Sequence, residues 1–575
     1  MAQVEYTAEV VDGLSIAKGI PLAEEQGLGP LTLAGYIRDV TAKWSGREAA
    51  MITLDGETTR WTYDDLWARA LEVAKALVAA GVGKGTRVGI LQTNRLEFLS
   101  CLFGTSLAGG IATTISTFFT PSELDEVLKA GCCSVLLIER NVLKKDFAEI
   151  LGELEPQIAS GASGDELESV RYPFLRHLAF VDSDESWGMI EGWSAFRARG
   201  CDIPDAIVDA TSASVMPSDP GLLFFSSGST GKAKGVLSSH RGVTLQLWRW
   251  KKWYNIQEPP RTWSANGFFW SGNFGMAMGG TITAGGTLLL QRWFDPQEAL
   301  ELLEREKATM ILAWPHQWAQ MEAVPGWEDF DLSPMHYIDA KVSFARHPKI
   351  STEWREPRHA YGNTETFTLI TVYASGTPEE ISAETHGPPT PGSTVKIVDV
   401  FAGATMPIGE RGEIAVKGPT LMMGYVGIPL DETLDEEGFL RCGDGGYIDA
   451  EGRLYWEGRL NDIIKTGGAN VSPVEIDAVL SKCPGVKAVQ TVGVPDELLG
   501  ELVVSCIVPH DGVTLDDDTI RSFAKEQLAS YKVPRRVLFV AESDLKTTGS
   551  QKIKTADLRA LASERLSELE EAADG

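Results

Sequence analysis

The chain has 575 residues, of which 43% are hydrophobic and 23% charged. This length and near-average composition predict a folded protein with more than one domain. Its 52 basic and 80 acidic residues give a net charge of −28, which repels nucleic acid and anionic membrane surfaces, so we expect neither as a partner. Any site for an anion must therefore be built locally.

The seven cysteines are odd in number, scattered, and never spaced as Cys-x-x-Cys. This usage predicts reduced thiols in a cytoplasmic protein, without a zinc knuckle. The first residues, MAQVEYTAEVVDGLSIAKGI, lack the basic and apolar regions of a secretory signal. Because no run of about eighteen apolar residues occurs, we expect no membrane span.

Helix and strand patterns alternate in the first part of the chain. Thr62 is a candidate N-cap, with Asp65 three residues later, for a helix whose apolar face runs from Leu66 to Leu77. The patterns that follow are, in order, a strand at 88–91, a helix at 96–107, a strand at 111–115, a helix from Pro121 and a strand at 134–138. This alternation predicts a parallel sheet covered by helices on both faces.

The later part of the chain predicts two further kinds of structure. Short strands are expected at 222–225, 287–290, 310–313 and 395–398, and from Gly412 short β segments between glycine-rich turns predict a β-rich subdomain. Beyond Gly458 the expected elements are helices at 473–480 and 516–528, strands at 486–492, 502–508 and 537–540, and a closing helix from Thr555. That last set is typical of a compact α+β unit.

We therefore expect an α/β protein. Its large N-terminal domain, residues 1–459, would hold layered parallel sheets with helices and the β-rich subdomain. Its small C-terminal domain, residues 460–575, would be the α+β unit.

The stretch FFSSGSTGKAKGV, residues 224–236, combines small hydroxyl residues, glycines and lysines. Backbone amides, hydroxyls and ammonium groups are what a polyphosphate needs. The spacing is not that of a Walker A loop, because Gly231-Lys232 is followed by Ala233 rather than Ser or Thr. Taken alone, the run is either a flexible linker or a different kind of phosphate-binding loop.

Three more runs follow in the chain: YGNTE at 361–365, RCGDGGYID at 441–449, and GRLNDIIKTGGANVSPVEID at 458–477. Together with the loop, in this order, they resemble the core motifs of the adenylate-forming superfamily of acyl-CoA synthetases, adenylation domains and firefly luciferase. The resemblance covers nearly the whole chain, from about Trp61 to Arg559. It implies a small, mobile C-terminal domain and a two-step ligase. A carboxylate attacks the α-phosphate of ATP to give an acyl-adenylate and pyrophosphate, and a thiol then takes the acyl group.

The resemblance also implies roles for the motif residues. The β- and γ-phosphates would be held by the loop residues Ser226, Ser227, Gly228, Ser229, Thr230, Gly231 and Lys234. Their chemistry agrees, since the hydroxyls donate, the glycines let backbone approach closely, and the lysine is a cation. In the YGNTE run, Tyr361 would flank adenine, followed by Gly362 and Asn363, Thr364 would touch the α-phosphate, and Glu365 would bind Mg²⁺.

For the remaining runs, Asp444 would accept hydrogen bonds from the ribose hydroxyls, and Arg459 would add a second ribose contact. Without the other motifs, an Asp-Gly hairpin turn would be the simpler reading of Asp444. In LKTTGSQKIKTADLR, Lys552 aligns with the lysine that bridges the carboxylate and the α-phosphate, and Lys546 and Lys554 are the alternatives. Asn461 would be the hinge of the small domain, and Gly468 would line the path of the coenzyme A thiol arm.

The acyl pocket is the part that the motifs define least. Aromatic residues around GFFW, including Trp248, Trp270 and Phe274, are candidates to line a pocket for an apolar or aryl acid, and equally for ordinary core packing. Lys341 is a candidate to contact a second polar group on the substrate. We expect ATP, Mg²⁺ and coenzyme A, with an apolar medium-chain, cyclic or aromatic acid, and a monomer or homodimer.

Alternative functions remain open on the sequence. An adenylation enzyme would pass the acyl group to a carrier protein or an amine. Relatives that activate amino acids place an Asp in the segment that here reads FFWSGNFGM, and this segment contains no Asp. A non-catalytic nucleotide-binding relative would have little reason to retain Thr364, Glu365, Asp444 and Lys552 together. An oxygenase of luciferase type shares the same motifs.

Overall fold

A computed structural model describes residues 6–574 apart from 228–232, 358, 383, 461, 463, 467–468, 497–498, 529–531 and 546–554. The chain forms two compact units. The first contains residues 1–9, 17–394 and 416–440, and the second contains residues 10–16, 395–415 and 441–575. The boundary expected between residues 459 and 460 lies within the second unit and stays a prediction.

The helices of the first unit alternate with its strands along the chain. They are α1 (Leu33–Lys43), α2 (Tyr63–Ala79), α3 (Leu96–Leu107), α4 (Pro121–Gly131), α5 (Phe147–Leu154), α6 (Pro156–Ser160), α7 (Trp193–Ala198), α8 (Asp205–Ala213), α9 (His240–Trp253), α10 (Ser271–Asn273), α11 (Gly280–Ala284), α12 (Pro296–Arg305), α13 (Pro315–Glu322) and α14 (Glu379–Ser382). At α2 the side chains of Thr62 and Asp65 form the expected capping box.

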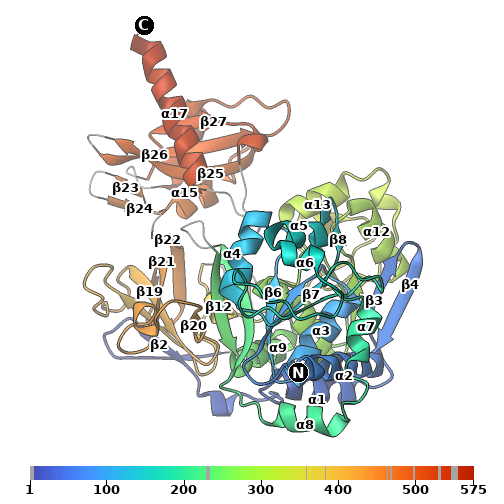
Figure 1. The fold of residues 1–575 in the computed structure, drawn as a ribbon. Coiled ribbons are helices and arrows are strands. Elements are labelled where there is room, and N and C mark those ends of the chain that lie inside the picture. The colour runs from blue at the N-terminus through green and yellow to red at the C-terminus, as the bar shows by residue number, and fades with distance from the viewer. Residues whose placement is uncertain are drawn as a thin grey trace. The chain divides into compact units, whose positions relative to one another are not determined.

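The first unit is built on a seven-stranded sheet in the order β10-β7-β5-β6-β11-β12-β20. Its strands are β5 (Arg87–Leu91), β6 (Ile111–Ile115), β7 (Val135–Ile138), β10 (His177–Phe180), β11 (Pro220–Ser227), β12 (Ala233–Ser239) and β20 (Gly424–Tyr425). The strands from β10 to β11 are parallel, whereas β12 and β20 pair antiparallel at one edge. Figure 1 shows β6, β7 and β12 among the helices α3, α4, α5 and α9.

Successive side chains of β11 enter two different hydrophobic cores. Leu222 and Phe224 pack with residues of α2, α3 and α9, whereas Leu223 and Phe225 pack with residues of α4 and α5. Alternation of this kind follows from the two-residue period of a strand. The prediction of a parallel sheet covered by helices on both faces is confirmed.

A five-stranded sheet in the same unit has the order β15-β13-β14-β3-β4. Its strands are β3 (Glu48–Leu54), β4 (Glu57–Thr62), β13 (Arg261–Ser264), β14 (Thr287–Leu290) and β15 (Met310–Leu312). Helices α12 and α13 pack on it through a core that includes Trp263, Leu300 and Trp318. The shorter elements are η1 (Leu22–Glu24), η2 (Phe274–Gly279, a π-helix), η3 (Trp327–Asp329), η4 (Ser343–Arg346), η5 (Thr364–Thr366), η6 (Leu430–Glu432), and the strand pairs β8 (Asn141–Val142) with β9 (Lys145–Asp146) and β16 (Ala360–Asn363) with β17 (Thr368–Val372).

A six-stranded sheet has the order β1-β2-β18-β19-β21-β22. Its strands are β1 (Ala8–Val10), β2 (Ile16–Gly19), β18 (Thr394–Val398), β19 (Gly412–Lys417), β21 (Leu440–Ile448) and β22 (Leu454–Arg459). The second unit continues with a sheet in the order β24-β23-β26-β25, in which β27 also pairs with β26. Its elements are β23 (Ile464–Thr466), β24 (Ala469–Val471), α15 (Pro473–Leu480), β25 (Val486–Asp496), β26 (Gly500–Pro509), α16 (Asp517–Gln527), β27 (Arg536–Phe539), η7 (Glu542–Asp544) and α17 (Thr555–Asp574).

All seven cysteines lie within the described residues, and none of them forms a disulfide, as the sequence predicts. Burial raises the pKa of Cys101, Cys133 and Cys506 to about 12. Among the described helices, none has the length and apolar character needed to span a bilayer.

The carboxyl group of Asp477, a residue of α15, is buried against the sheet that contains β25 and β26. Gln490 donates a hydrogen bond to its Oδ2 at 3.2 Å. Burial raises its pKa from 3.8 to about 7, and the polar groups of nearby Thr491 offset only part of the rise. Because the folded state keeps this proton to a higher pH than the unfolded state, the contribution to stability is full below about pH 4 and is lost as the pH rises toward about 7.

Asp477→Asn should therefore stabilise the second unit at pH 8, by on the order of 2 to 4 kcal/mol, and change its stability little at pH 4. The measurement is hydrogen exchange of β25 and β26, compared with the wild type at each pH. Asp511→Asn, at an exposed turn residue, is the control and should change neither value. Equal effects of Asp477→Asn at both pH values would show that the carboxyl is not the cause.

Candidate active site

The strands β11, β12 and β20 bring the side chains of Ser226, Lys234 and Tyr425 to one edge of the seven-stranded sheet. Ser226 of β11 lies opposite Lys234 of β12, and Val236 of β12 lies opposite Tyr425 of β20. Lys234 is two residues from Val236, so its side chain is on the face that Tyr425 shares. The Lys234 ammonium lies 5.1 Å from the centre of the Tyr425 ring, within the range of a cation–π contact.

Several predicted site residues lie outside the described residues. They are Gly228, Ser229, Thr230, Gly231, Asn461, Gly468 and Lys552. Ser227 is the last residue of β11, and its backbone pairs with Ala233 at the start of β12. The roles given to Ser227 and to the seven residues outside the described part of the chain stay predictions.

The YGNTE run forms the end of β16 and the short η5 turn. Tyr361 is buried within the β16–β17 pair, opposite Thr371. Asn363 caps η5, because its Oδ1 accepts from the Thr366 amide while the Thr366 hydroxyl accepts from the Asn363 amide, each at 3.0 Å. This cap fixes Thr364 and Glu365 in the turn between them.

The backbone after this turn is strained. Phe367 and Thr368 have φ values of 45° and 82°, a left-handed conformation that costs a side-chain-bearing residue about 1 to 2 kcal/mol. The chain doubles back so closely that a β-carbon on Gly362 would lie 1.8 Å from the carbonyl oxygen of Thr368. Position 362 therefore admits only glycine in this conformation.

An aromatic cluster holds the strained turn in place. The Phe367 ring lies 5.6 Å from that of Phe224 on β11 and 5.8 Å from that of Phe274 at the start of η2. Phe224 and Phe274 also contact each other edge to face, at 5.6 Å. Burial of these rings offsets the backbone strain and links β11, η2 and η5.

Glu365 is the described carboxylate best suited to a metal ion at this site. Its Oε1 accepts a hydrogen bond from the Tyr425 hydroxyl at 2.8 Å, and its backbone carbonyl accepts from Met422 N at 2.7 Å. Within the described residues, no group of three or more His, Cys, Asp or Glu side chains could hold a metal. A single carboxylate fits Mg²⁺, which commonly takes one or two protein carboxylates and fills its other positions with phosphate and water.

In the second unit, Asp444 and Arg459 face each other across β21 and β22. Arg459 Nε lies 3.2 Å from Asp444 Oδ1, and the Asp444 side chain is 4% exposed. Glu413 on β19 holds the same strand by accepting from the Gly443 amide at 3.0 Å and from Arg441 Nε at 2.6 Å. The structure thus brings the two predicted ribose ligands together, and it places Asp444 inside a strand rather than in a hairpin turn.

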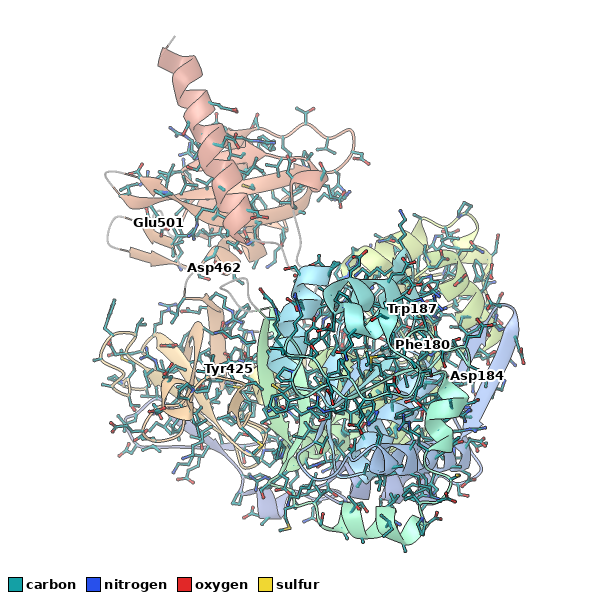
Figure 2. All side chains as sticks on the ribbon, in the orientation of Figure 1. Phe180, Asp184, Trp187, Tyr425, Asp462 and Glu501 are labelled. Atoms are coloured by element: carbon teal, nitrogen blue, oxygen red, sulfur yellow. The ribbon has the colours of Figure 1, made fainter. Side chains whose placement is uncertain are left out.

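Asp462, labelled in Figure 2, follows the predicted hinge residue. Its amide donates to the Arg459 carbonyl at 3.0 Å. Burial raises its pKa, and the positive charges of Arg559 and Arg459 offset part of that effect.

The candidate pocket residues lie in different surroundings. Trp248 is in the core, where it contacts Tyr36 at 4.8 Å and donates from Nε1 to the Pro30 carbonyl. Phe274 belongs to the aromatic cluster. Trp270 is half-buried and stacks on Phe118 at 5.8 Å, whereas Lys341 forms an ion pair with Glu379.

Sequence reasoning missed Phe367 and Tyr425 in the first unit and Glu413 in the second unit. Each acts through a neighbour from a distant part of the chain, so no local spacing marks it.

Comparison with known proteins gives two family matches. Residues 38–426 match the model of the AMP-binding enzyme family, and residues 475–552 match the AMP-binding enzyme C-terminal domain. A methyl-dioxo-octahydroindenyl-propanoyl:CoA ligase of Mycobacterium tuberculosis is 30% identical over 502 residues, 85% of this chain and 91% of its own. A feruloyl-CoA synthase of an Amycolatopsis species is 29% identical over 520 residues, 87% of this chain and 94% of its own.

A solved structure has the same fold. ATP-bound MatB from Rhodopseudomonas palustris superposes with a TM-score of 0.72 at 22% identity, covering 93% of this chain and 99% of its own. The expected fold class, with a large N-terminal and a small C-terminal domain, is confirmed.

Gly362→Ala should destabilise the first unit by about 3 kcal/mol or more, because the added methyl group meets the Thr368 carbonyl. Thermal unfolding of the purified variant measures the loss. Gly272→Ala in α10 is the matched control, since a β-carbon there has no neighbour within 4 Å, and we expect it to change stability by about 1 kcal/mol at most. Similar unfolding temperatures for the two variants would contradict the steric argument.

Proposed function

We infer the reaction of this chain from its family: it belongs to the AMP-binding enzyme family, whose model matches residues 38–426. The chain is an AMP-forming acid–thiol ligase. It activates a carboxylic acid with ATP and passes the acyl group to coenzyme A, giving acyl-CoA, AMP and pyrophosphate. The resemblance noted in the sequence is thereby confirmed at the level of the family.

One observation carries the assignment of the triphosphate end of the site. A lysine ammonium and a glutamate carboxylate both contact the phenol of Tyr425, and the strands β11 and β12 flank residues 228–232, whose sequence is GSTGK. Phosphate oxygens need a cation and hydroxyl or amide donors, and their metal ion needs a carboxylate. Ser226, Lys234 and Glu365 supply these groups in our proposal.

The reaction proceeds by two displacements. In the first, a carboxylate oxygen of the acid attacks the α-phosphorus, and the bond to the pyrophosphate oxygen breaks. In the second, the thiol of coenzyme A loses its proton to solvent, its sulfur attacks the acyl carbonyl, and the bond between the acyl carbon and the AMP oxygen breaks. Lys234 stabilises the departing pyrophosphate, and Lys552 stabilises the charge that develops between acid and α-phosphate.

The other motif residues position the nucleotide. Thr364 lies at the α-phosphate, Tyr361 flanks adenine beside Gly362 and Asn363, and Asp444 with Arg459 binds the ribose. Glu365 would hold Mg²⁺, and the bound ion would supply positive charge to the phosphate oxygens.

The second step requires a change in the C-terminal domain. We propose that Asn461 is the pivot, and that rotation about it withdraws Lys552 and brings Gly468 to the path of the coenzyme A arm. A glycine suits a position where a ligand passes close to the backbone. Gating of this kind separates the two half-reactions.

The substrate we propose is an apolar carboxylic acid carrying a ring or a medium-length chain. Two relatives are named for an aromatic and a bicyclic acid, and Trp270 stacked on Phe118 offers a flat aromatic surface. An acyl acceptor other than coenzyme A is the alternative, because another structural neighbour is an amide bond synthetase.

Pyrophosphate release across a panel of aryl, cyclic and linear acids tests the function. We expect release with at least one ring-bearing or medium-chain acid, and thioester formation when coenzyme A is added. The alternative acceptor would be favoured if adenylate forms but coenzyme A gives no thioester, and if the acyl group is transferred once an amine or carrier protein is supplied. No release with any acid would contradict the function.

Lys552→Ala should lower adenylate formation by on the order of 10² to 10³ in rate while leaving thiolysis of a supplied acyl-adenylate largely intact. The two half-reactions are measured separately by pyrophosphate release and thioester formation. Lys546→Ala and Lys554→Ala are the matched controls and should affect neither step strongly. A parallel loss of both half-reactions in folded Lys552→Ala would rule out the assigned role.

A further inference from the structure

The phenol of Tyr425 contacts two charged side chains from separate parts of the chain. From this geometry we propose that Tyr425 is a positioning residue that sets the carboxylate of Glu365 through its hydroxyl and the ammonium of Lys234 through its ring. The inference rests on the proposed function, in which these two groups meet the metal-bound triphosphate. Figure 2 labels Tyr425 on the ribbon.

The contact with Glu365 restrains the carboxylate from one side. The Tyr425 hydroxyl donates to Oε1 at 2.8 Å, which is a strong hydrogen bond because the acceptor is charged. Met422, three residues earlier, donates its amide to the Glu365 carbonyl at 2.7 Å. One segment therefore fixes both the backbone and the side chain of Glu365. The Tyr425 hydroxyl bonds to Oε1 and not to Oε2.

The contact with Lys234 follows from strand register. Tyr425 lies directly opposite Val236, and Lys234 is the diagonal neighbour on the same face. The 5.1 Å distance between ammonium and ring centre allows attraction without removing any of the three hydrogen-bond donors of the lysine. The ring contact thus orients Lys234 without using any of the donors that phosphate oxygens require.

The backbone on both sides of Tyr425 is anchored to β12. Met423 N donates to the Leu237 carbonyl at 2.7 Å, and Val426 N donates to the Gly235 carbonyl at 2.8 Å. Gly424 has a φ of 140°, a conformation that side-chain-bearing residues rarely adopt. This two-residue strand is therefore a rigid support for one aromatic side chain.

The two contacts can be separated experimentally by Tyr425→Phe, which keeps the ring and removes the hydroxyl, and Tyr425→Leu, which removes both. The measurement is calorimetric binding of ATP to the full-length protein without an acid substrate, once in EDTA and once with Mg²⁺. Tyr172→Phe is the matched control, because its hydroxyl also donates to a carboxylate, that of Asp125, at 2.7 Å.

For Tyr425→Phe we expect the enhancement of ATP binding by Mg²⁺ to fall about tenfold, with affinity in EDTA unchanged within about twofold. For Tyr425→Leu we expect an additional loss of about two- to fivefold in EDTA, which disappears in a Lys234→Ala background. In turnover, the half-saturating Mg²⁺ concentration should rise in Tyr425→Phe while KM for the acid does not change. The control should match the wild type in every measurement.

An unchanged Mg²⁺ enhancement in Tyr425→Phe would overturn the role of the hydroxyl. A loss in Tyr425→Leu that persists in the Lys234→Ala background would overturn the role of the ring. Either result with an active wild type refutes this inference alone. A wild type that neither binds ATP nor releases pyrophosphate with any acid would refute the proposed function instead.

Discussion

The pairing register of β11, β12 and β20 is the constraint on which the triphosphate end of the proposed site depends. Side chains alternate along a strand, so a shift of one residue would turn Lys234 and Tyr425 to the opposite face. The register is protected because Leu222 with Phe224 and Leu223 with Phe225 enter separate cores. A slipped strand would place both pairs on the wrong side, and the cost of exposing or misplacing four large apolar side chains prevents it.

The turn after β16 meets a different demand, since it must project Thr364 and Glu365 while the chain reverses. Two consecutive left-handed residues achieve the reversal, and the Asn363 cap together with the three-phenylalanine cluster stabilises it. Strain retained at such a place is common at functional sites, where the surrounding packing determines the backbone. The π-helical form of η2, which supplies Phe274 to the same cluster, is in keeping with this pattern.

Much of the fold could be predicted from local signals. The capping box at Thr62 and the apolar runs of β5, β6 and β14 lie where the sequence indicates them, because caps and periodicity act over a few residues. The hydrogen bond from Tyr425 to Glu365 spans sixty residues of sequence, and it exists only because β20 adds to the edge of β12. The support that Glu413 gives to Gly443 depends in the same way on strands that are neighbours in space but not in the chain. Pairing of this kind leaves no trace in composition or spacing.

The state of the cysteines gives the chain a property of practical use. Cys201 alone among the seven is exposed, while Cys101, Cys133, Cys483 and Cys506 are buried and burial disfavours the thiolate that reacts with electrophiles. Cys201 belongs to none of the proposed nucleotide or acyl contacts. A maleimide dye should therefore attach there first, ahead of the partly exposed Cys132 and Cys442.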